Sequence, residues 1–115
     1  MPDISDIPET TPSGKLIIIA TLKVKPGNED RIKEILQGAK KDANSDKEPK
    51  TLSYRTALSV SSSGQHQSEF VVVEEYLGGR AGVMEHGAQA GSQALLKARE
   101  EGVFEEFDLK FYDEF

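Results

Sequence analysis

The sequence contains no cysteine and only two histidines among its 115 residues. The lack of cysteine excludes disulfide bonds, thiolate chemistry and cysteine-ligated zinc or iron–sulfur sites, and it suits a cytoplasmic protein. The histidines, His66 and His86, stand far apart in the chain. This separation disfavours a histidine-rich metal site, so we expect no bound metal.

Long apolar runs and an excess of positive charge are also absent. The longest apolar run, residues 16–20, has the length of a strand and is too short to cross a bilayer. The first residues are acidic and lack the apolar core of a secretory signal, so we expect none. The formal net charge is −6, whereas nucleic acids and anionic membranes attract basic patches. We therefore predict no nucleic acid and no membrane as partner.

The first 14 residues have little apolar content and contain the prolines Pro2, Pro8 and Pro12. A segment of this composition buries too little surface to fold alone, so we predict a flexible N-terminal arm over residues 1–14. The alternative is an arm that docks on a partner subunit. Residues 15–115 have the length of one domain with its own hydrophobic core.

Hydrophobic periodicity predicts the elements of this domain. Residues 15–24 form a strand that is apolar on both faces, which indicates a central place in a sheet. Residues 29–43 have an apolar stripe at helical spacing, and Asn28 is the expected N-cap. Residues 51–60 and 68–76 are expected to pair as a hairpin, with Leu52 and Tyr54 on one face.

The rest of the chain completes a recognisable order. Residues 80–87 are predicted to be a short helix, residues 92–101 a second helix after a break at Gly91, and residues 104–112 a last strand. The order β-α-β-β-α-β predicts an α+β, ferredoxin-like fold with a four-stranded antiparallel sheet. Helices on one face leave the other exposed, so we predict a homodimer whose two sheets face each other.

Four short sequence patterns lie on these predicted elements, one after another along the chain. They are Val24-Lys25-Pro26-Gly27 before an acidic helix start, Thr51-Leu52-Ser53-Tyr54-Arg55, Val73-Glu74-Glu75-Tyr76, and Ala81 with His86. Together they resemble the antibiotic biosynthesis monooxygenase (ABM) domain over residues 15–112. The resemblance implies the dimeric α/β barrel fold of that family.

Some positions depart from the family pattern. Tyr76 stands where the family usually has tryptophan, and His86 comes one residue later than in common members, which changes its helical phase by about 100°. The haem-degrading branch has an asparagine on its first strand, and residues 15–24 contain none. The resemblance therefore disfavours haem degradation.

The resemblance implies oxygenation of a small aromatic, polyketide-like or other lipophilic metabolite without flavin, haem or metal. A phenolate or enolate can pass an electron to O₂ directly, so the protein need only bind the substrate, assist deprotonation and stabilise developing charge. No dinucleotide-binding, phosphate-loop or zinc-protease motif is visible. We therefore expect no cofactor, with molecular oxygen as co-substrate.

Three residues are the candidate catalytic groups. His86 is the candidate base, because an imidazole has an unperturbed pKa near neutrality. Tyr76 is expected to orient a phenolic substrate, and Glu74 to hold the imidazole or accept a proton. The expected substrate-binding residues are Tyr54, Phe70, Val72, Met84 and Arg80.

Structural roles stay open for the same residues. His86 can be a surface histidine or bond a strand carboxylate, Tyr76 can be a core aromatic, and Glu74 or Glu75 can form an ion pair with an arginine. Two other functions also stay open for the whole protein. One is an acid–base enzyme of the polyketide cyclase or isomerase type, and the other is a non-catalytic ligand-binding dimer.

Overall fold

A computed structural model describes residues 4–115. Its elements are a 3₁₀ helix η1 (Ile4–Asp6), β1 (Lys15–Val24), α1 (Glu29–Ala43), β2 (Thr51–Val60), β3 (His66–Leu77), α2 (Arg80–Gly87), α3 (Ala90–Glu100) and β4 (Phe104–Asp113). The four strands form one antiparallel sheet in the order β2-β3-β1-β4, which confirms the predicted α+β, ferredoxin-like fold.

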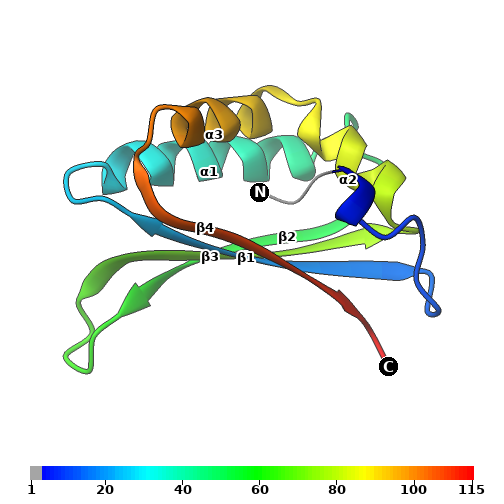
Figure 1. Cartoon of the computed structure of the whole chain (residues 1–115), viewed down its shortest axis with the longest axis horizontal. Helices are drawn as coiled ribbons and strands as arrows, with labels where there is room; N and C mark the ends of the chain where they lie inside the picture. The colour runs from blue at the N-terminus through cyan, green and yellow to red at the C-terminus, as the bar shows by residue number, and fades with distance from the viewer. Residues whose placement is uncertain (1–3) are drawn as a thin grey trace.

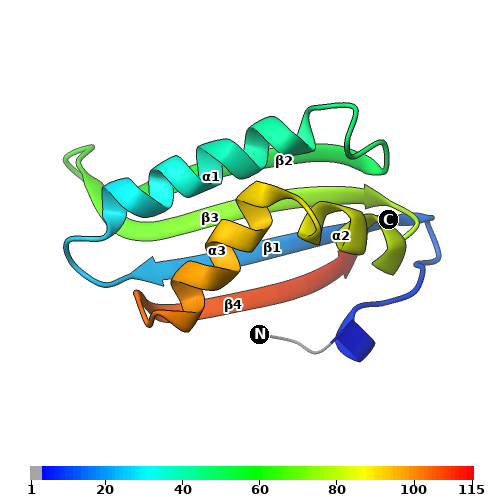
Figure 2. The same ribbon diagram turned by 90° about the horizontal axis from the view of Figure 1, so that it is seen from above.

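The helices form a single layer on one face of the sheet. Figure 1 shows α1, α2 and α3 above the strands, with the opposite face of the sheet uncovered by the described residues. Seen from above, α1 runs along β2 and β3, whereas α3 crosses obliquely toward β4 (Figure 2). The core therefore lies between this helical layer and the sheet.

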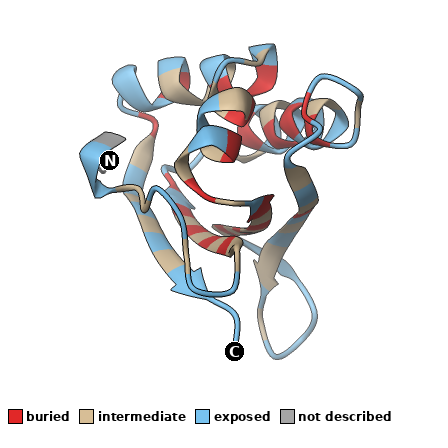
Figure 3. Cartoon of the chain, turned by 90° about the vertical axis from the view of Figure 1, so that its right-hand side faces the viewer, coloured by how far each residue is buried: buried red, intermediate tan, exposed pale blue. Residues whose placement is uncertain are grey.

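Strand β1 is central, as its two apolar faces predicted, and it pairs with both β3 and β4. Leu16, Ile18 and Leu22 are buried, whereas Ile17 and Ile19 on the other face are half-buried. Buried residues concentrate where the sheet and the helices face each other (Figure 3). The period of two in the sequence thus separates the core face from the outer face.

Helix α1 begins at the predicted residue, with Asn28 at the predicted N-cap position. Its stripe of Ile32, Leu36 and Ala39 is buried, as predicted. Asn28 makes no side-chain capping hydrogen bond. Instead the Glu29 carboxylate accepts a hydrogen bond from the Gly27 N–H at 2.7 Å. The positive end of the helix dipole favours a negative charge at this position.

Because of a bulge at the start of β2, the side chain of Leu52 does not lie on the predicted face of the sheet. Thr51 and Ser53 pair with consecutive residues of β3, so Leu52 is the extra residue of the register shift. Its side chain is 50% exposed, whereas Tyr54 is buried. The prediction that these two share a face is wrong, because one inserted residue breaks the period of two.

Gly91 lies inside α3 rather than at a break before it. A Cβ at this position would lie 2.5 Å from the backbone of Ala39 on α1, so the close crossing of α1 and α3 requires glycine. The Gly91 N–H also donates a hydrogen bond to Asp42 Oδ2 at 3.1 Å. The predicted helix start at Ser92 therefore moves to Ala90, because this glycine serves packing.

The described part of the N-terminal segment lies against its own domain. The Arg80 N–H donates a hydrogen bond to Pro8 O at 2.9 Å, and the Arg80 guanidinium donates two to Ile7 O at 2.7 and 3.0 Å. Ile7 also packs against the buried cluster of Leu16, Ile18 and Tyr76. These contacts join residues 7 and 8 to the domain, whereas the flexibility of the arm stays a prediction. Residues 1–3 of that arm lie outside the described residues.

Candidate functional site

A cavity of about 100 Å³ lies between the sheet and helices α2 and α3. Most of its wall is apolar. Four polar side chains line it, those of Tyr54, Glu74, His86 and Ser92. The apolar side chains that line it are Ile18, Ala20, Leu22, Val72, Val83, Leu95, Leu96, Phe107 and Leu109.

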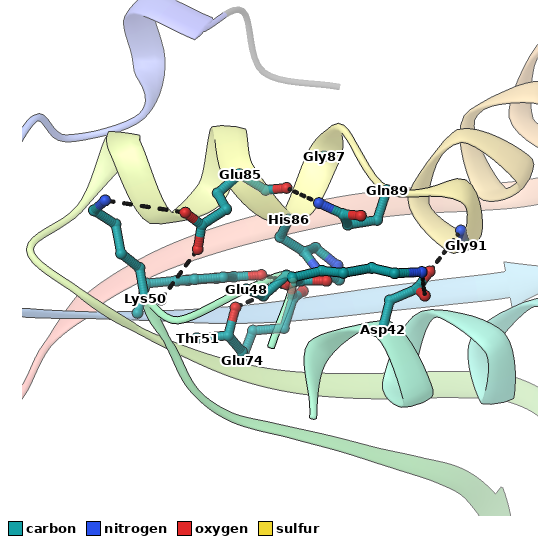
Figure 4. A network of polar contacts seen from close by, with 12 residues as sticks. Asp42, Glu48, Lys50, Thr51, Glu74, Glu85, His86, Gly87, Gln89 and Gly91 are labelled. Atoms are coloured by element: carbon teal, nitrogen blue, oxygen red, sulfur yellow. Dashed lines mark hydrogen bonds and ion pairs between the residues drawn. The ribbon is translucent and has the colours of Figure 1, made fainter. Parts of the chain in front are cut away.

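A carboxylate from the α1–β2 loop holds the histidine of this cavity. Glu48 is fully buried. Its Oε1 accepts hydrogen bonds from His86 Nδ1 at 2.7 Å and from Thr51 Oγ1 at 2.8 Å (Figure 4). Because a carboxylate only accepts, Nδ1 carries a proton and the orientation of the imidazole is set.

The other ring nitrogen of His86 faces strand β3. His86 Nε2 lies 3.8 Å from Glu74 Oε1, and Tyr76 OH donates a hydrogen bond to the same oxygen. Burial raises the pKa of Glu74, against the opposing effects of the Tyr76 hydrogen bond and the charge of His86. A buried carboxyl that holds its proton more tightly can give a proton to a neighbouring base or to a substrate.

Two tyrosines flank the imidazole. The ring centroids of Tyr54 and His86 are 5.0 Å apart, and those of Tyr76 and His86 are 6.0 Å apart. Burial raises the pKa of both phenols well above the usual range, and the charge of Glu74 adds to the effect. Both side chains therefore stay protonated, and their hydroxyl groups remain hydrogen-bond donors.

Helix α2 is held over the strand that presents Glu74. A Cβ on Gly82 would lie 3.0 Å from the Tyr76 Cβ, so this glycine allows α2 to approach β3 closely. The Lys50 N–H donates a hydrogen bond to Glu85 Oε1 at 3.1 Å, which ties α2 to the loop that presents Glu48 (Figure 4). Close packing on one side and a tether on the other thus place His86 between two carboxyl groups.

The two β3 carboxylates have different surroundings. Glu75 lies on the outer face of the sheet, where it binds Ser53 Oγ and pairs with Lys15 Nζ at 3.0 Å. Glu74 lies on the helix-covered face beside Tyr76 and His86. The sequence left open an ion pair between one of these carboxylates and an arginine. In the structure Glu75 pairs with a lysine instead, and Glu74 belongs to a buried polar cluster.

The structure brings five of the predicted site residues together. Tyr54, Val72, Glu74 and His86 line the cavity, and Tyr76 reaches it through its hydrogen bond to Glu74. The late position of His86 along the helix does not turn its side chain away from the sheet, since its Nε2 lies 3.8 Å from Glu74 Oε1 on β3.

Three predicted substrate-binding residues lie elsewhere. Phe70 lines a separate cleft of about 210 Å³ under α1, because it lies farther along β3 toward the hairpin. Met84 is 49% exposed on the outer side of α2. Arg80 binds the N-terminal segment, with its guanidinium on Ile7 O and on Glu9 Oε1. None of the three lines the cavity that contains His86.

Glu48 is the residue of the site that sequence reasoning missed. It belongs to a polar loop, residues 44–50, which has no periodicity from which burial could be inferred. The following proline restricts the backbone of Glu48 to extended conformations, but this does not say where the side chain points. Only the packing of α2 against the loop shows that Glu48 and His86 meet.

The polar cluster brings an imidazole, two buried carboxyl groups and two phenols together beside one cavity. Among residues 4–115, no group of three or more metal-ligating side chains is arranged to hold a metal ion. No helix in the same part of the chain is long and apolar enough to span a membrane. The side chains at the cavity can bind a small ligand, orient its hydroxyl group and exchange a proton with it.

Comparisons with known proteins agree on the fold. No protein-family model matches this chain, and no curated protein matches it. Solved structures do match. A Caulobacter crescentus CB15 protein, provisionally named an antibiotic biosynthesis monooxygenase, has a TM-score of 0.69 at 20% identity over 89% of this chain and 91% of its own. The chain has the ABM fold.

Other solved structures support the same assignment. A structure named antibiotic biosynthesis monooxygenase has a TM-score of 0.69 at 21% identity, over 87% of this chain and 98% of its own. A protein from Shewanella oneidensis has a TM-score of 0.69 at 18% identity over 94% of each chain. The resemblance seen in the sequence is thus confirmed as a shared fold. At these identities the likeness carries no activity or substrate over to this chain.

Proposed function

We propose that this protein is a cofactor-independent monooxygenase that oxidises a small aromatic or otherwise lipophilic metabolite in the cavity under α2 and α3. The observation that carries the proposal is the buried His86, bound at Nδ1 by Glu48 and facing Glu74 with Nε2. An imidazole fixed in this way accepts a proton from one defined direction. The apolar wall beside it supports a lipophilic substrate.

The chemistry needs only the substrate, O₂ and proton transfer. His86 Nε2 removes the proton of a phenol or enol, and the resulting anion passes one electron to O₂. The two radicals combine into a C–O bond, and a proton converts the product to a hydroperoxide. Loss of water leaves a carbonyl, so R₂CH₂ and O₂ become R₂C=O and H₂O, and the substrate supplies every electron.

Glu74 and Glu48 have separate parts in this proposal. Because burial raises the pKa of Glu74, this carboxyl can protonate the peroxide oxygen that leaves as water. Glu48 stabilises the imidazolium that forms when His86 takes the substrate proton, since its oxygen already accepts from Nδ1. Tyr54 and Tyr76 are placed to orient the substrate hydroxyl group.

Oxygen uptake with anthrone-like and hydroquinone substrates tests the proposal. The expected result is consumption of one O₂ per substrate, with a carbonyl product that carries one oxygen atom from ¹⁸O₂. Turnover of the same substrates under strict anaerobiosis would instead establish an acid–base enzyme of the cyclase or isomerase type. A complete lack of turnover, together with tight ligand binding, would establish a non-catalytic binding protein.

We also propose that two copies associate through the uncovered face of the sheet. Ile17, Ile19, Val71 and Val73 form its apolar centre. Charged residues of both signs, including Arg55, Asp108 and Lys110, lie exposed around it. A second copy related by a two-fold axis can bury this centre and pair opposite charges at the rim.

The mass in solution tests the dimer. Sedimentation at micromolar concentration is expected to give twice the chain mass, and Ile19→Glu is expected to give the monomer, because it places a charge in the apolar centre. Glu34→Lys, on the exposed side of α1, is the control and is expected to leave the dimer intact. A wild-type mass equal to one chain would contradict the proposal.

A further inference from the structure

Residues 7–9, here called the N-terminal strap, are fixed to the start of α2. The Arg80 N–H donates a hydrogen bond to Pro8 O, and the Arg80 guanidinium donates two to Ile7 O. A Cβ on Gly79 would lie 2.6 and 2.7 Å from the carbonyl oxygens of residues 8 and 9. The strap therefore lies directly on the backbone before α2, and Figure 2 shows the N-terminal segment passing beside this helix.

The side chain of Ile7 lies behind one wall of the cavity. Ile7 belongs to an apolar cluster that also contains Ile18, Val83 and Leu109. These three side chains line the cavity that contains His86, whereas Ile7 does not. They therefore separate the cavity from the strap, and the strap covers this wall from outside.

The other end of the N-terminal segment is fixed separately from the strap. The Gly78 N–H donates a hydrogen bond to Gly14 O at 2.7 Å, where the segment enters β1. Between the two attachments, residues 10–12 line part of a cleft of about 260 Å³, and the end of β4 lines another part. The strap can therefore detach from Arg80 and turn about residues 10–12 while Gly14 stays in place.

The cavity needs to widen before it can hold one aromatic ring. It measures about 100 Å³, whereas an apolar protein cavity on the order of 150 Å³ binds benzene. The strands below it are held by their hydrogen bonds, and α3 is held against α1 by the close approach at Gly91. The wall of Val83 and Leu109 is backed instead by Ile7, which belongs to no helix or strand. Outward movement of this wall requires the release of Ile7.

We propose that the N-terminal strap gates the cavity, and that its release from Arg80 makes room for the ligand. The docked strap keeps the cavity small, and the released strap lets Val83 and Leu109 move outward. That the ligand is aromatic rests on the proposed function, whereas the strap and the wall that it covers rest on the structure alone. Ligand binding and strap release then favour each other.

Amide hydrogen exchange, measured by NMR under argon with phenol as the probe, tests this linkage without turnover. The Arg80 N–H is in the first turn of α2, where N–H groups have no partner within the helix. Its hydrogen bond to Pro8 O protects it only while the strap is docked. Saturating phenol is expected to speed its exchange about fivefold. The Gly78 N–H, which bonds to Gly14 O, is the control and is expected to keep its rate.

Two variants release the strap from different sides. Arg80→Gln removes the guanidinium that binds Ile7 O, and Gly79→Ala places a methyl group against Pro8 O. Each is expected to bind phenol about fivefold more tightly than wild-type protein in calorimetry, because lost hydrogen bonds of this kind no longer oppose opening.

A matched control accompanies each variant. Arg31→Gln removes an exposed arginine that pairs with Glu101, far along the chain from the strap. Gly38→Ala adds a methyl group to a glycine of α1 with nothing within 4 Å of it. Both controls are expected to bind phenol as the wild-type protein does.

A strap that only supports the wall predicts the opposite sign. Phenol binding that is unchanged or weaker in Arg80→Gln and Gly79→Ala would overturn the inference. So would exchange of the Arg80 N–H that phenol leaves unchanged or slows, and a failure of phenol to bind the wild-type protein and both variants. The proposed function fails separately. If both variants bind phenol more tightly but oxygen uptake is absent for every substrate, the monooxygenase proposal falls and the strap stands.

Discussion

The cavity under α2 and α3 and the cleft under α1 each have a histidine and an aromatic residue in their walls. The cleft under α1 is the larger, with about 210 Å³ against about 100 Å³. His66 in the cleft is exposed, whereas His86 is 7% exposed and bonded to a buried carboxylate. The two regions therefore share residue types and differ in burial and in hydrogen-bond partners.

This difference shows which property identifies a candidate site. Burying Glu48, Glu74 and His86 together removes charge from water, and apolar residues of similar volume would often be more stable there. One oxygen of Glu48 also has no partner among the described residues. The cleft with His66 has no comparable cluster. Buried, incompletely satisfied polar groups point to function more strongly than cavity volume does.

The largest expected effect comes from substituting each of the two histidines separately. His86→Gln removes the proposed base and is expected to lower kcat by 10²- to 10⁴-fold, the usual contribution of a general base. His66→Gln is expected to change kcat by less than about twofold, since His66 is exposed outside the proposed catalytic cavity. The oxygen-uptake assay measures both. Equal effects of the two variants would remove the distinction between the two regions.

The next effect concerns the helix that walls the cavity. Gly91→Ala places a methyl group against the backbone of Ala39, so it is expected to destabilise the fold by about 1–3 kcal/mol, as overpacking does. Gly38→Ala is the matched control on α1, because nothing lies within 4 Å of its added methyl group. It is expected to stabilise the protein by up to about 1 kcal/mol through helix propensity. Urea denaturation measures both changes.

A substitution of Glu48 tests whether the contact between Glu48 and His86 matters for the reaction. Glu48→Gln keeps the shape and a hydrogen-bond acceptor but removes the charge that stabilises the imidazolium. We expect kcat to fall about tenfold, KM to change little, and the acid limb of the pH–rate profile to move to lower pH. The control Glu34→Gln, on the exposed side of α1, changes net charge equally and is expected to have no effect. An unchanged pH profile in Glu48→Gln would leave Glu48 with a structural role only.

The last effect is on stability at alkaline pH. Burial raises the pKa of Tyr54 and Tyr76, so the folded state keeps protons that the unfolded chain releases above about pH 10. The stability from these protonated phenols is fully present below that pH and declines as the pH rises above it. The expected slope is about 1.4 kcal/mol per pH unit for each tyrosine.

Chemical denaturation between pH 8 and pH 11 measures this slope. Tyr54→Phe is expected to lower it by the share of one tyrosine, because phenylalanine has no proton to release. Tyr112→Phe, on the exposed part of β4, is the comparison variant. A slope that Tyr54→Phe leaves unchanged would show that the buried phenol is not the cause.

Much of the fold could be predicted from the sequence, because the hydrophobic patterns that indicate strands and helices are local. The alternation of β1 and the stripe of α1 show a buried and an open face within single elements, and both patterns hold in the structure. The packing roles of Leu52 and Gly91 were not predictable, because a bulge and a helix crossing depend on the partner element. The same limit applies to the cavity, where Val72 lines the wall and Phe70 does not.

The sequence by itself determined the element order, the sheet and the polar end of β3 that presents Glu74 and Tyr76. Only the tertiary structure decided that Glu48 binds His86, which lies 38 positions farther along the chain. It also decided that Arg80 binds the N-terminal segment instead of the cavity. The physical reason is that backbone periodicity is encoded over a few residues, whereas a buried polar cluster exists only where separate elements meet.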